Sequence, residues 1–426
     1  MATGKVSDLG TLITRGPVEF EAARARETAQ SFDLKALTTD FYENPYPYFH
    51  ALRTHDPIRQ LGANSYFITR YADLMAVYKD AKVFSSDKKS EFLPKFGDGL
   101  LYQHHTTSLI FNDPPLHTRV RRIIAGALNP RAVMDLEAPM IAMVDGLLDR
   151  MAERRHGDII EDLAAAVPIE VIGNLLAIPH DARDPLRAWS LDILGALEPQ
   201  LTPEMLGRGE IAVRDFLEYL RILVGERRKK PGNPERDVLT RLILGERDGE
   251  TLSEVELLQN CIFILNAGHE TTTNLIGNAL YALLEWPDEK ARLLADPKLI
   301  QSAVEEFLRF ESPVQLGNRI TTERTVIGGV EMQEGTFVTL GIAAANRDPA
   351  AFTDPDRLDL GRTNNKHLAF ASGVHVCVGL TIARMEGRVA IQRFLTRFPK
   401  YRLSGPVIRG NRARFRGYLS IPVALG

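Results

Sequence analysis

The most distinctive chemical group of this chain is the thiol of Cys377, within residues 370–379, which read Phe-Ala-Ser-Gly-Val-His-Val-Cys-Val-Gly. Gly373 and Gly379 lie on either side of the cysteine and permit tight backbone turns. A helical pattern follows from about Val378, and the free amides at the start of a helix favour negative charge on a nearby sulfur. We therefore expect Cys377 to be a metal-binding thiolate. The alternative is a buried structural cysteine, which is a common setting for a free thiol.

A second candidate group lies at the centre of a long predicted helix. Ser253 and Glu256 have the spacing of a capping box, and the helical pattern that follows continues to about Glu285. At 1.5 Å per residue, a helix of this length would cross the whole domain.

The middle of this helix reads Asn-Ala-Gly-His-Glu-Thr-Thr over residues 266–272. Gly268 inside a helix costs about 1 kcal/mol relative to alanine, so it needs a compensating role. Ala267 and Gly268 remove side-chain bulk, and Thr271 presents a hydroxyl on the face of Ala267, next to the acidic Glu270. The alternative is a glycine that serves helix packing beside a surface glutamate.

A third candidate group follows the sequence Asp113-Pro-Pro, which predicts the start of a helix with Asp113 as its cap. His117 and Arg121 are four residues apart and share one face of that helix, where they could bind an anionic group together. An exposed polar face is the alternative.

These motifs resemble those of the cytochrome P-450 haem-thiolate monooxygenases, in the form found in bacteria without a membrane anchor. Four separate stretches occur in the order of that family, namely 113–121, 267–272, 306–309 and 370–379. The resemblance implies haem b as the cofactor, with Cys377 as the axial ligand of its iron. One difference is Ala371, where the family usually has glycine; if this position needs a positive φ, alanine is strained.

The resemblance also implies roles for further residues. The haem would be bound by His117, Arg121, Ala267, Gly268, Arg319, Phe370, Gly373, His375 and Gly379. Thr271 and Glu270 would be catalytic and would deliver protons to bound dioxygen. The substrate pocket would include Phe263, Asn266, Val314, Leu316 and Phe415, with Lys88, Lys89 and Lys95 available for a substrate carboxylate. Residues 185–207 would form a lid, and Arg357 would join a structural cluster with Glu306 and Arg309.

The composition of the 426 residues is that of an ordinary globular protein, with 44% hydrophobic and 25% charged residues and a formal net charge of -3. The charge gives no indication of nucleic-acid binding. Two cysteines, Cys261 and Cys377, cannot form a disulfide framework and lack zinc-site spacing, which fits a reducing, cytoplasmic setting. The first residues contain no apolar run that could anchor the chain in a membrane.

The expected fold is the mainly α-helical prism of the family, a triangular prism with small β-sheets and the haem between the long central helix and the cysteine loop. We expect residues 1–30 to be weakly ordered and residues 31–426 to form a single haem-binding monooxygenase domain.

The expected activity is hydroxylation or O-dealkylation of a small hydrophobic substrate, such as an aromatic acid or a terpenoid, by O2. The motifs include no flavin or nicotinamide fingerprint, so electrons would come from a separate ferredoxin and its reductase, docking near Arg119 and Arg122. Three alternatives remain open: a haem-thiolate peroxygenase or isomerase, a non-catalytic haem sensor, and a zinc or disulfide protein without haem.

Overall fold

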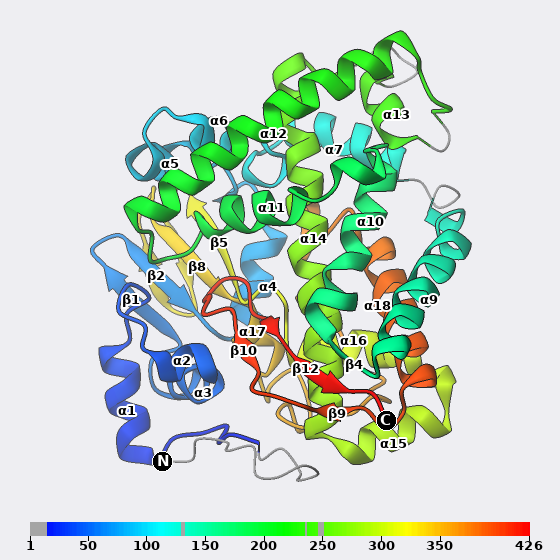
Figure 1. Cartoon of the computed structure of the whole chain (residues 1–426). Helices are drawn as coiled ribbons and strands as arrows, with labels where there is room; N and C mark the ends of the chain where they lie inside the picture. The colour runs from blue at the N-terminus through cyan, green and yellow to red at the C-terminus, as the bar shows by residue number, and fades with distance from the viewer. Residues whose placement is uncertain (1–14, 129–132, 235–236, 246–250) are drawn as a thin grey trace.

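The protein is mainly helical, with its largest sheet at one side of a central helix (Figure 1). The structure, a computed structural model, describes residues 15–128, 133–234, 237–245 and 251–426. The central helix is α14 (Glu254–Glu285), which the sequence predicted. Its capping box is formed: Ser253 Oγ accepts from the Glu256 amide at 3.2 Å, and the Glu256 carboxylate accepts from the Ser253 amide at 2.8 Å.

Helix α14 is buried along most of its length because other helices cover it on several sides. It contacts α10 (Ala166–Leu175), α11 (Leu186–Gly195), α12 (Pro203–Lys229) and α18 (Leu380–Arg397). A helix that is apolar around most of its circumference is expected in such a central position. Cys261 lies in this core and is fully buried.

The remaining described α-helices surround this centre. They are α1 (Ala22–Ser31), α2 (Thr39–Glu43), α3 (Tyr46–His55), α4 (Tyr71–Lys79), α5 (Lys89–Phe96), α6 (Leu100–Thr107), α7 (Leu116–Ala127), α9 (Glu137–Arg154), α13 (Val238–Leu244), α15 (Pro287–Ala295), α16 (Ile300–Phe310) and α17 (Ile342–Asn346).

The largest sheet has the strand order β1-β2-β8-β5-β3. Its strands are β1 (Ile58–Gly62), β2 (Ser65–Ile68), β8 (Phe337–Gly341), β5 (Leu316–Thr321) and β3 (Phe84–Ser85). Strands β1 and β2 form a hairpin, in which they pair antiparallel with Ile58 opposite Ile68. Strand β2 then pairs parallel with β8.

Three smaller sheets complete the strands of the described residues. They pair β10 (Ile408–Arg409) with β11 (Tyr418–Ser420), join β4 (His156–Asp158), β12 (Pro422–Ala424) and β9 (Arg402–Leu403), and pair β6 (Thr325–Ile327) with β7 (Val330–Met332). The turn between β10 and β11 approaches α14 and contributes to the site described below.

The expectation of a weakly ordered segment over residues 1–30 is wrong for its last part. Residues 22–31 form α1, which packs against α3 through the buried Ala25 and Ala29. Small side chains permit this close approach, and small residues carry little of the hydrophobic signal that a sequence pattern needs. Residues 1–14 lie outside the described part of the chain.

Two predicted contacts are replaced by others. Asp113 does not cap α7; its carboxylate accepts from Ser85 Oγ at 2.5 Å and from the Ser86 amide at 2.8 Å, which ties the start of α7 to β3. Helix α7 begins at Leu116 with Pro115 in the cap position, so Asp113 lies two residues before the cap.

The arginine that joins Glu306 and Arg309 is Arg362, not Arg357. Arg362 Nε donates to Glu306 Oε2 at 3.0 Å, while Arg357 contributes its backbone carbonyl to Arg309 at 3.2 Å and has an exposed side chain. Glu306 and Arg309 themselves pair within α16 at 2.8 Å and are fully buried.

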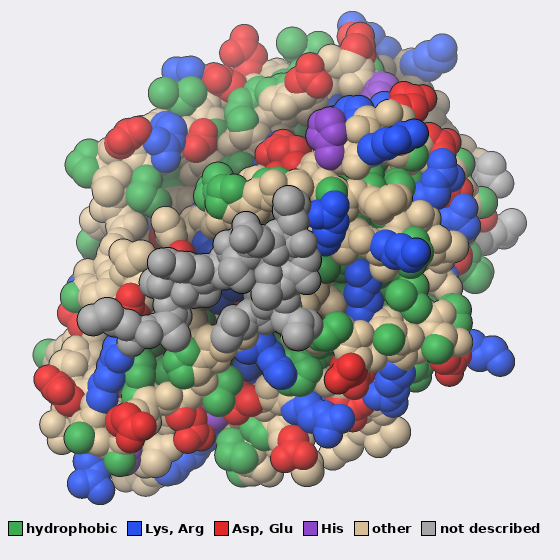
Figure 2. Space-filling view, turned by 60° about the horizontal axis from the view of Figure 1, so that its bottom comes forward, with side chains coloured by type: hydrophobic (Ala, Val, Ile, Leu, Met, Phe, Trp, Pro, Cys, Tyr) green, Lys and Arg blue, Asp and Glu red, His purple; other side chains and the backbone are tan. Residues whose placement is uncertain are grey.

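On the surface shown in Figure 2, basic and acidic side chains are interspersed with hydrophobic ones. Within the described ranges, every helix is too short or too polar to cross a membrane.

Candidate active site

Cys377 lies in a tightly turned loop that leads into α18. Its amide donates to the carbonyl of Phe370 at 3.0 Å, and α18 begins at Leu380, three residues further on. Ala371 has φ 57°, in the left-handed region, as expected for a position that usually carries glycine. Gly373 has φ 69°, and a Cβ there would collide with the carbonyl oxygen of Tyr78. The loop therefore has a fixed shape that presents the sulfur.

Burial raises the pKa of the Cys377 thiol, whereas the Gly379 amide, Arg121 and Arg384 lower it. The net direction is upward, although the Gly379 amide at the helix start favours the thiolate, as the sequence indicated. Desolvation disfavours a buried anion more than one amide and two arginines favour it. A metal cation bound to the sulfur would supply the missing positive charge.

His117, next to the cysteine loop, and His375, within it, have ring nitrogens without hydrogen-bond partners among the described residues. The imidazole rings of His117 and His375 lie 4.2 Å apart, centroid to centroid. Within the described residues, both ring nitrogens of His117 and Nε2 of His375 are buried without a hydrogen-bond partner. Burial, Arg319, His117 and Arg121 lower the pKa of His375 to about 3. Neutral imidazoles next to two guanidinium groups form a set of donors that suits carboxylates.

One stretch of α14 is exposed although the turns around it are buried. Ala267 is exposed and Phe263, Gly268 and Thr271 are partly exposed. Thr271 Oγ1 donates to the Ala267 carbonyl at 2.7 Å. Because an apolar central helix is otherwise covered, this opening marks a space beside Ala267 and Thr271.

Gly268 has a packing role. A Cβ at this position would come within 2.8 Å of Ile172 Cδ1, in α10. The close approach of α10 to α14 thus explains the glycine, in agreement with the packing alternative. By contrast, a Cβ at Gly379 would meet no atom within 4 Å, so space is open above the cysteine loop.

These observations fit the haem that the sequence resemblance predicts. A haem with two propionates would fit this site in three ways. Its iron would supply a cation next to the Cys377 sulfur, and its propionates would accept hydrogen bonds from the imidazoles. The ring itself would occupy the open space at Gly379 and Ala267. Cys377 could ligate the iron, and His117, Arg121, Arg319 and His375 could bind the propionates.

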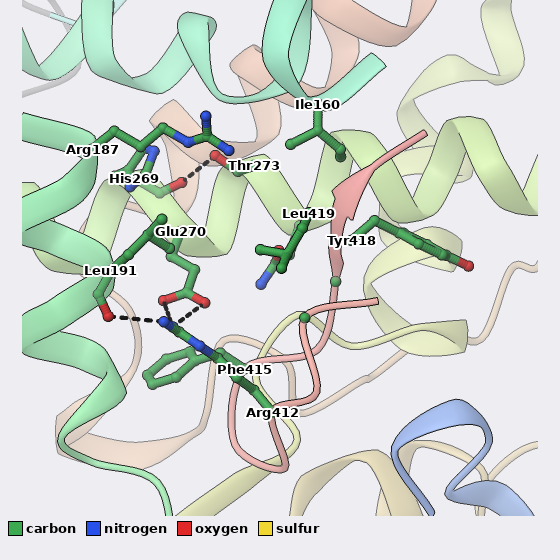
Figure 3. A pocket seen from close by; sticks show the side chains of 13 residues that line it. Ile160, Arg187, Leu191, His269, Glu270, Thr273, Arg412, Phe415, Tyr418 and Leu419 are labelled. Atoms are coloured by element: carbon green, nitrogen blue, oxygen red, sulfur yellow. Dashed lines mark hydrogen bonds and ion pairs between the residues drawn. The ribbon is translucent and has the colours of Figure 1, made fainter. Parts of the chain in front are cut away.

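Glu270, the predicted proton donor, binds an arginine that the sequence did not single out. Arg412 Nη1 donates to Glu270 Oε1 at 2.6 Å and to Oε2 at 2.7 Å (Figure 3). Burial raises the pKa of Glu270 to about 7, against the opposing effect of Arg412. Among the described residues, the Glu270 carboxylate and the Thr271 hydroxyl make no hydrogen bond to each other. Arg412 lies far along the chain in the β10–β11 turn, and no spacing pattern indicates such a pairing.

The predicted pocket residues do not all lie together. Phe263 and Val314 are partly buried, and Val314 forms a β-bridge with Phe415, which lines a small cavity next to Glu270. Leu316 instead packs in the core with Phe67 and Ala343, so its predicted pocket role is wrong. Alternating strand residues face opposite sides of a sheet, and Leu316 faces the N-terminal helices.

Asn266 belongs to a buried polar group that the sequence only partly indicated. Its Nδ2 lies 3.3 Å from His104 Nε2, and His104 Nδ1 lies 3.0 Å from Gln259 Oε1. The Asn266 Oδ1 atom is buried and has no partner among the described residues. His104 comes from α6.

The three lysines proposed for a substrate carboxylate differ in their surroundings. Lys88 is buried and pairs with Glu91 at 3.1 Å, and burial lowers its pKa to about 8. Lys95 donates to the carbonyl of Glu198 at 3.2 Å. Lys89 is exposed and pairs with Asp87 at 2.6 Å. Each ammonium group therefore has a partner within the protein.

Comparisons with known proteins agree with the haem site inferred from the geometry. A sequence model described as cytochrome P-450 matches residues 197–400. The biotin biosynthesis cytochrome P-450 of Bacillus subtilis is 34% identical over 86% of this chain and 92% of its own length. The vitamin D(3) 25-hydroxylase of Pseudonocardia autotrophica is 36% identical over 91% of this chain and 95% of its own length.

A solved structure shows the same fold. It contains P-450BioI in complex with an acyl carrier protein ligated to hexadec-9Z-enoic acid. The TM-score is 0.85 with 32% sequence identity, covering 91% of this chain and all of that one.

Proposed function

Because this chain belongs to the cytochrome P-450 family, we propose that it is a haem monooxygenase that inserts one oxygen atom of O2 into a small hydrophobic molecule. The reaction would be a hydroxylation or an O-dealkylation, and the electrons would come from a separate ferredoxin and its reductase. The observation that carries this proposal is the partly buried Cys377 thiol close to His117 and His375, three of whose ring nitrogens are buried without a partner among the described residues.

In this proposal the cysteine loop and α14 hold haem b between them. Cys377 would bind the iron, and His117, Arg121, Arg319 and His375 would donate hydrogen bonds to the propionates. When bound, haem supplies the redox centre at which O2 is reduced, and a thiolate ligand favours cleavage of the O–O bond. Ala267, exposed on α14, would leave room for O2 beside the haem.

Thr271 and Glu270 provide the protons that the formation of water requires. The Thr271 hydroxyl already donates its proton to the Ala267 carbonyl, so its oxygen is oriented to accept a hydrogen bond from the pocket. Glu270 has a pKa of about 7, which suits a group that gives and regains a proton near neutral pH.

The named activities of similar proteins differ widely, so the substrate must be inferred from this chain's own pocket. The apolar Phe263, Val314 and Phe415 favour a hydrophobic molecule. Lys88 and Lys95 already have partners, which makes a substrate carboxylate less favourable than a neutral group. Asn266 Oδ1 could accept a hydrogen bond from a substrate hydroxyl. A neutral terpenoid therefore fits better than an aromatic acid.

The proposal also covers the domain organisation, the location and the electron donor of the protein. The ordered chain would act as one haem-binding domain in the cytoplasm. A ferredoxin would dock on the side of α7 that carries Arg119 and Arg122. Arg119 is paired with Glu256, so its charge is partly neutralised at that surface.

The decisive experiment is the absorption spectrum of the dithionite-reduced protein with carbon monoxide. We expect a strongly red-shifted Soret band in the wild type and its loss in Cys377→His. The absence of any haem band would contradict the proposal and would indicate that Cys377 is a structural cysteine.

Product formation separates the haem-based alternatives. Turnover with ferredoxin, reductase and O2 is expected; turnover with peroxide alone would indicate a peroxygenase. Ligand binding without product under any electron supply would indicate a haem sensor.

A further inference from the structure

Two neighbouring carboxylates of α16 bind different parts of the chain. Glu306 is fully buried and pairs with Arg309 and Arg362. Glu305 is partly exposed, and its carboxylate pairs with residues that lie before and after Cys377 in the sequence. The acid that precedes Glu306 therefore has a separate set of contacts, which involve the cysteine loop.

After the cysteine, Glu305 binds an arginine of α18. Arg384 Nε donates to Glu305 Oε1 at 2.7 Å, and Arg384 Nη2 donates to Glu305 Oε2 at 2.8 Å. Two parallel hydrogen bonds of this kind fix the orientation of a guanidinium group. Burial raises the pKa of the Cys377 thiol, and Arg384 is one of the groups that lower it. The charge that Glu305 orients therefore acts on the sulfur.

Before the cysteine, Glu305 binds a histidine. His367 Nδ1 accepts a hydrogen bond from the Ala369 amide at 3.2 Å, so the proton of the neutral ring is on Nε2. That nitrogen lies 3.2 Å from Glu305 Oε2 and donates to it. The His367 side chain is only 3% exposed, so this bond is shielded from water.

Both partners of Glu305 also contact Phe370. The ring centroids of His367 and Phe370 are 5.8 Å apart, and the guanidinium carbon of Arg384 lies 5.1 Å from the Phe370 centroid, within cation–π range. The Phe370 carbonyl in turn accepts from the Cys377 amide at 3.0 Å. Glu305 thus holds a ring and a charge against the residue that fixes the cysteine backbone.

The Glu305 carboxylate stays ionised in this position. Burial raises its pKa, but the hydrogen bonds from His367 and Arg384 outweigh burial and lower the pKa of Glu305 to about 2. A partly exposed ion pair contributes little to folding stability. The main consequence of these contacts is therefore the placement of the charge and of the loop.

We infer that Glu305 is a positioning residue of the cysteine loop, which binds His367 before Cys377 and Arg384 after it and holds the guanidinium charge near the sulfur. The inference rests on the proposed function, in which the sulfur ligates the haem iron. A fixed positive charge near the sulfur favours the state of the site that carries one more electron. Glu305, acting through Arg384, would therefore favour the transfer of one electron from the ferredoxin to the ferric iron.

The first test is a double-mutant cycle on the reduction potential of the haem-bound protein. Arg384→Gln should lower the potential, with a fall of at least about threefold in the reduction equilibrium constant, or about 28 mV at 59 mV per tenfold change for one electron. In the Glu305→Leu background the guanidinium is no longer held, so Arg384→Gln should leave the potential nearly unchanged. Equal shifts in the two backgrounds, or no shift in Arg384→Gln, would overturn the inference.

The matched control is a second ion pair of α18. Arg393 makes the same two-bonded pair with Asp145 of α9, and the two side chains are partly exposed like those of Arg384 and Glu305. Arg393 lies further along α18, away from the cysteine. Arg393→Gln should not change the potential. A shift as large as that of Arg384→Gln would indicate a general effect of surface charge and contradict the inference.

The second test needs neither turnover nor reduction of haem. Amide hydrogen exchange over residues 367–379 reports on the hydrogen bond between the Cys377 amide and the Phe370 carbonyl. Glu305→Leu should speed this exchange about tenfold, because the loop loses its bonds on both sides of the cysteine. Asp145→Leu should leave it unchanged. Equal exchange in Glu305→Leu and wild type would show that Glu305 does not hold the loop.

A histidine variant separates the two contacts of Glu305. His367→Phe keeps an aromatic ring next to Phe370 but removes the hydrogen bond to Glu305, while Arg384 keeps its carboxylate partner. Exchange over residues 367–370 should increase, and the reduction potential should stay close to that of the wild type. A fall in potential as large as that in Arg384→Gln would contradict the assignment of the charge effect to Arg384.

The outcomes for Glu305 and for the proposed function can be told apart. A protein that gives the red-shifted carbon monoxide spectrum but shows none of these changes in potential or exchange loses only the role of Glu305. A protein without that spectrum loses the monooxygenase assignment, and the exchange comparison still decides whether Glu305 holds the loop.

Discussion

The rings of His117 in α7 and His375 in the cysteine loop lie 4.2 Å apart at an interplanar angle of 49°, and three of their nitrogens are buried without partners among the described residues. An unsatisfied buried polar atom costs about 1 to 3 kcal/mol, so this arrangement is expected only where a ligand supplies acceptors. The pair is therefore the feature of the protein that most directly indicates bound carboxylates.

Replacing one of these donors should weaken haem binding. For His375→Phe we expect the haem affinity, measured by titrating the haem-free protein, to fall between about 10- and 100-fold, as for the loss of a hydrogen bond to a charged group. His180→Phe is the control, because the His180 side chain is 82% exposed and far from the loop in sequence. Equal affinities in the two variants would remove His375 from the site.

The alcohol on α14 should control the coupling of electron supply to product. Thr271→Ala is expected to retain haem and substrate but to divert reducing equivalents to peroxide, because the relay hydroxyl is lost. The measurement is peroxide formed per electron pair consumed. Thr273→Ala is a matched control, since Thr273 makes the same type of bond, to the His269 carbonyl, on a buried face. Unchanged coupling in Thr271→Ala would exclude Thr271 from the relay.

Ala371 of the cysteine loop has a left-handed backbone conformation, so its replacement by glycine should stabilise the protein. Ala371→Gly is expected to raise the free energy of unfolding by about 0.5 to 1 kcal/mol, because relief of strain at φ 57° exceeds the added freedom of the unfolded chain. The midpoint of urea unfolding measures this. In α18 the same change, Ala383→Gly, should destabilise by about 1 kcal/mol. A lower midpoint for Ala371→Gly would show that the strain is absent.

Glu386 of α18 should make the protein less stable as the pH rises. Burial raises its pKa to about 8, and it accepts a hydrogen bond from Thr272 at 3.3 Å. The folded state therefore keeps this proton from the ordinary glutamate range up to about pH 8, while the unfolded state has lost it. The contribution of Glu386 to stability is complete at low pH and falls by about 1.4 kcal/mol per pH unit across that window.

Glu386→Gln should remove this part of the pH dependence. The test is the difference in unfolding free energy between variant and wild type, followed by denaturant from pH 5 to pH 8. Exposed Glu254 provides the control variant, Glu254→Gln, whose difference should stay flat. A constant difference for Glu386→Gln would show that Glu386 ionises normally.

Arg362 and Arg357 can be compared directly as candidate partners of Glu306 in α16. Arg362→Met should cost about 2 kcal/mol of unfolding free energy, because it removes hydrogen bonds to the buried Glu306 carboxylate. Arg357→Met should change it by no more than about 0.5 kcal/mol, since that side chain is exposed. The reverse order would contradict the observed pairing.

The sequence was sufficient for features that depend on neighbours along the chain. The capping box at Ser253 and the long helix α14 follow from spacings of three and four residues, and both are confirmed. The loop motif singled out Ala371 as a position where a positive φ would strain alanine, and the order of four motifs indicated the family. Such features could be predicted because the interacting groups lie within a few residues of one another.

Only the tertiary structure decided which distant groups meet. Arg362 rather than Arg357 reaches Glu306, Arg412 binds Glu270, and Leu316 faces the core instead of the pocket. These outcomes depend on how α11, the β10–β11 turn and the N-terminal helices pack. Burial likewise decided that the pKa of Cys377 rises without a bound cation, because desolvation depends on every element around a group and not on its own loop.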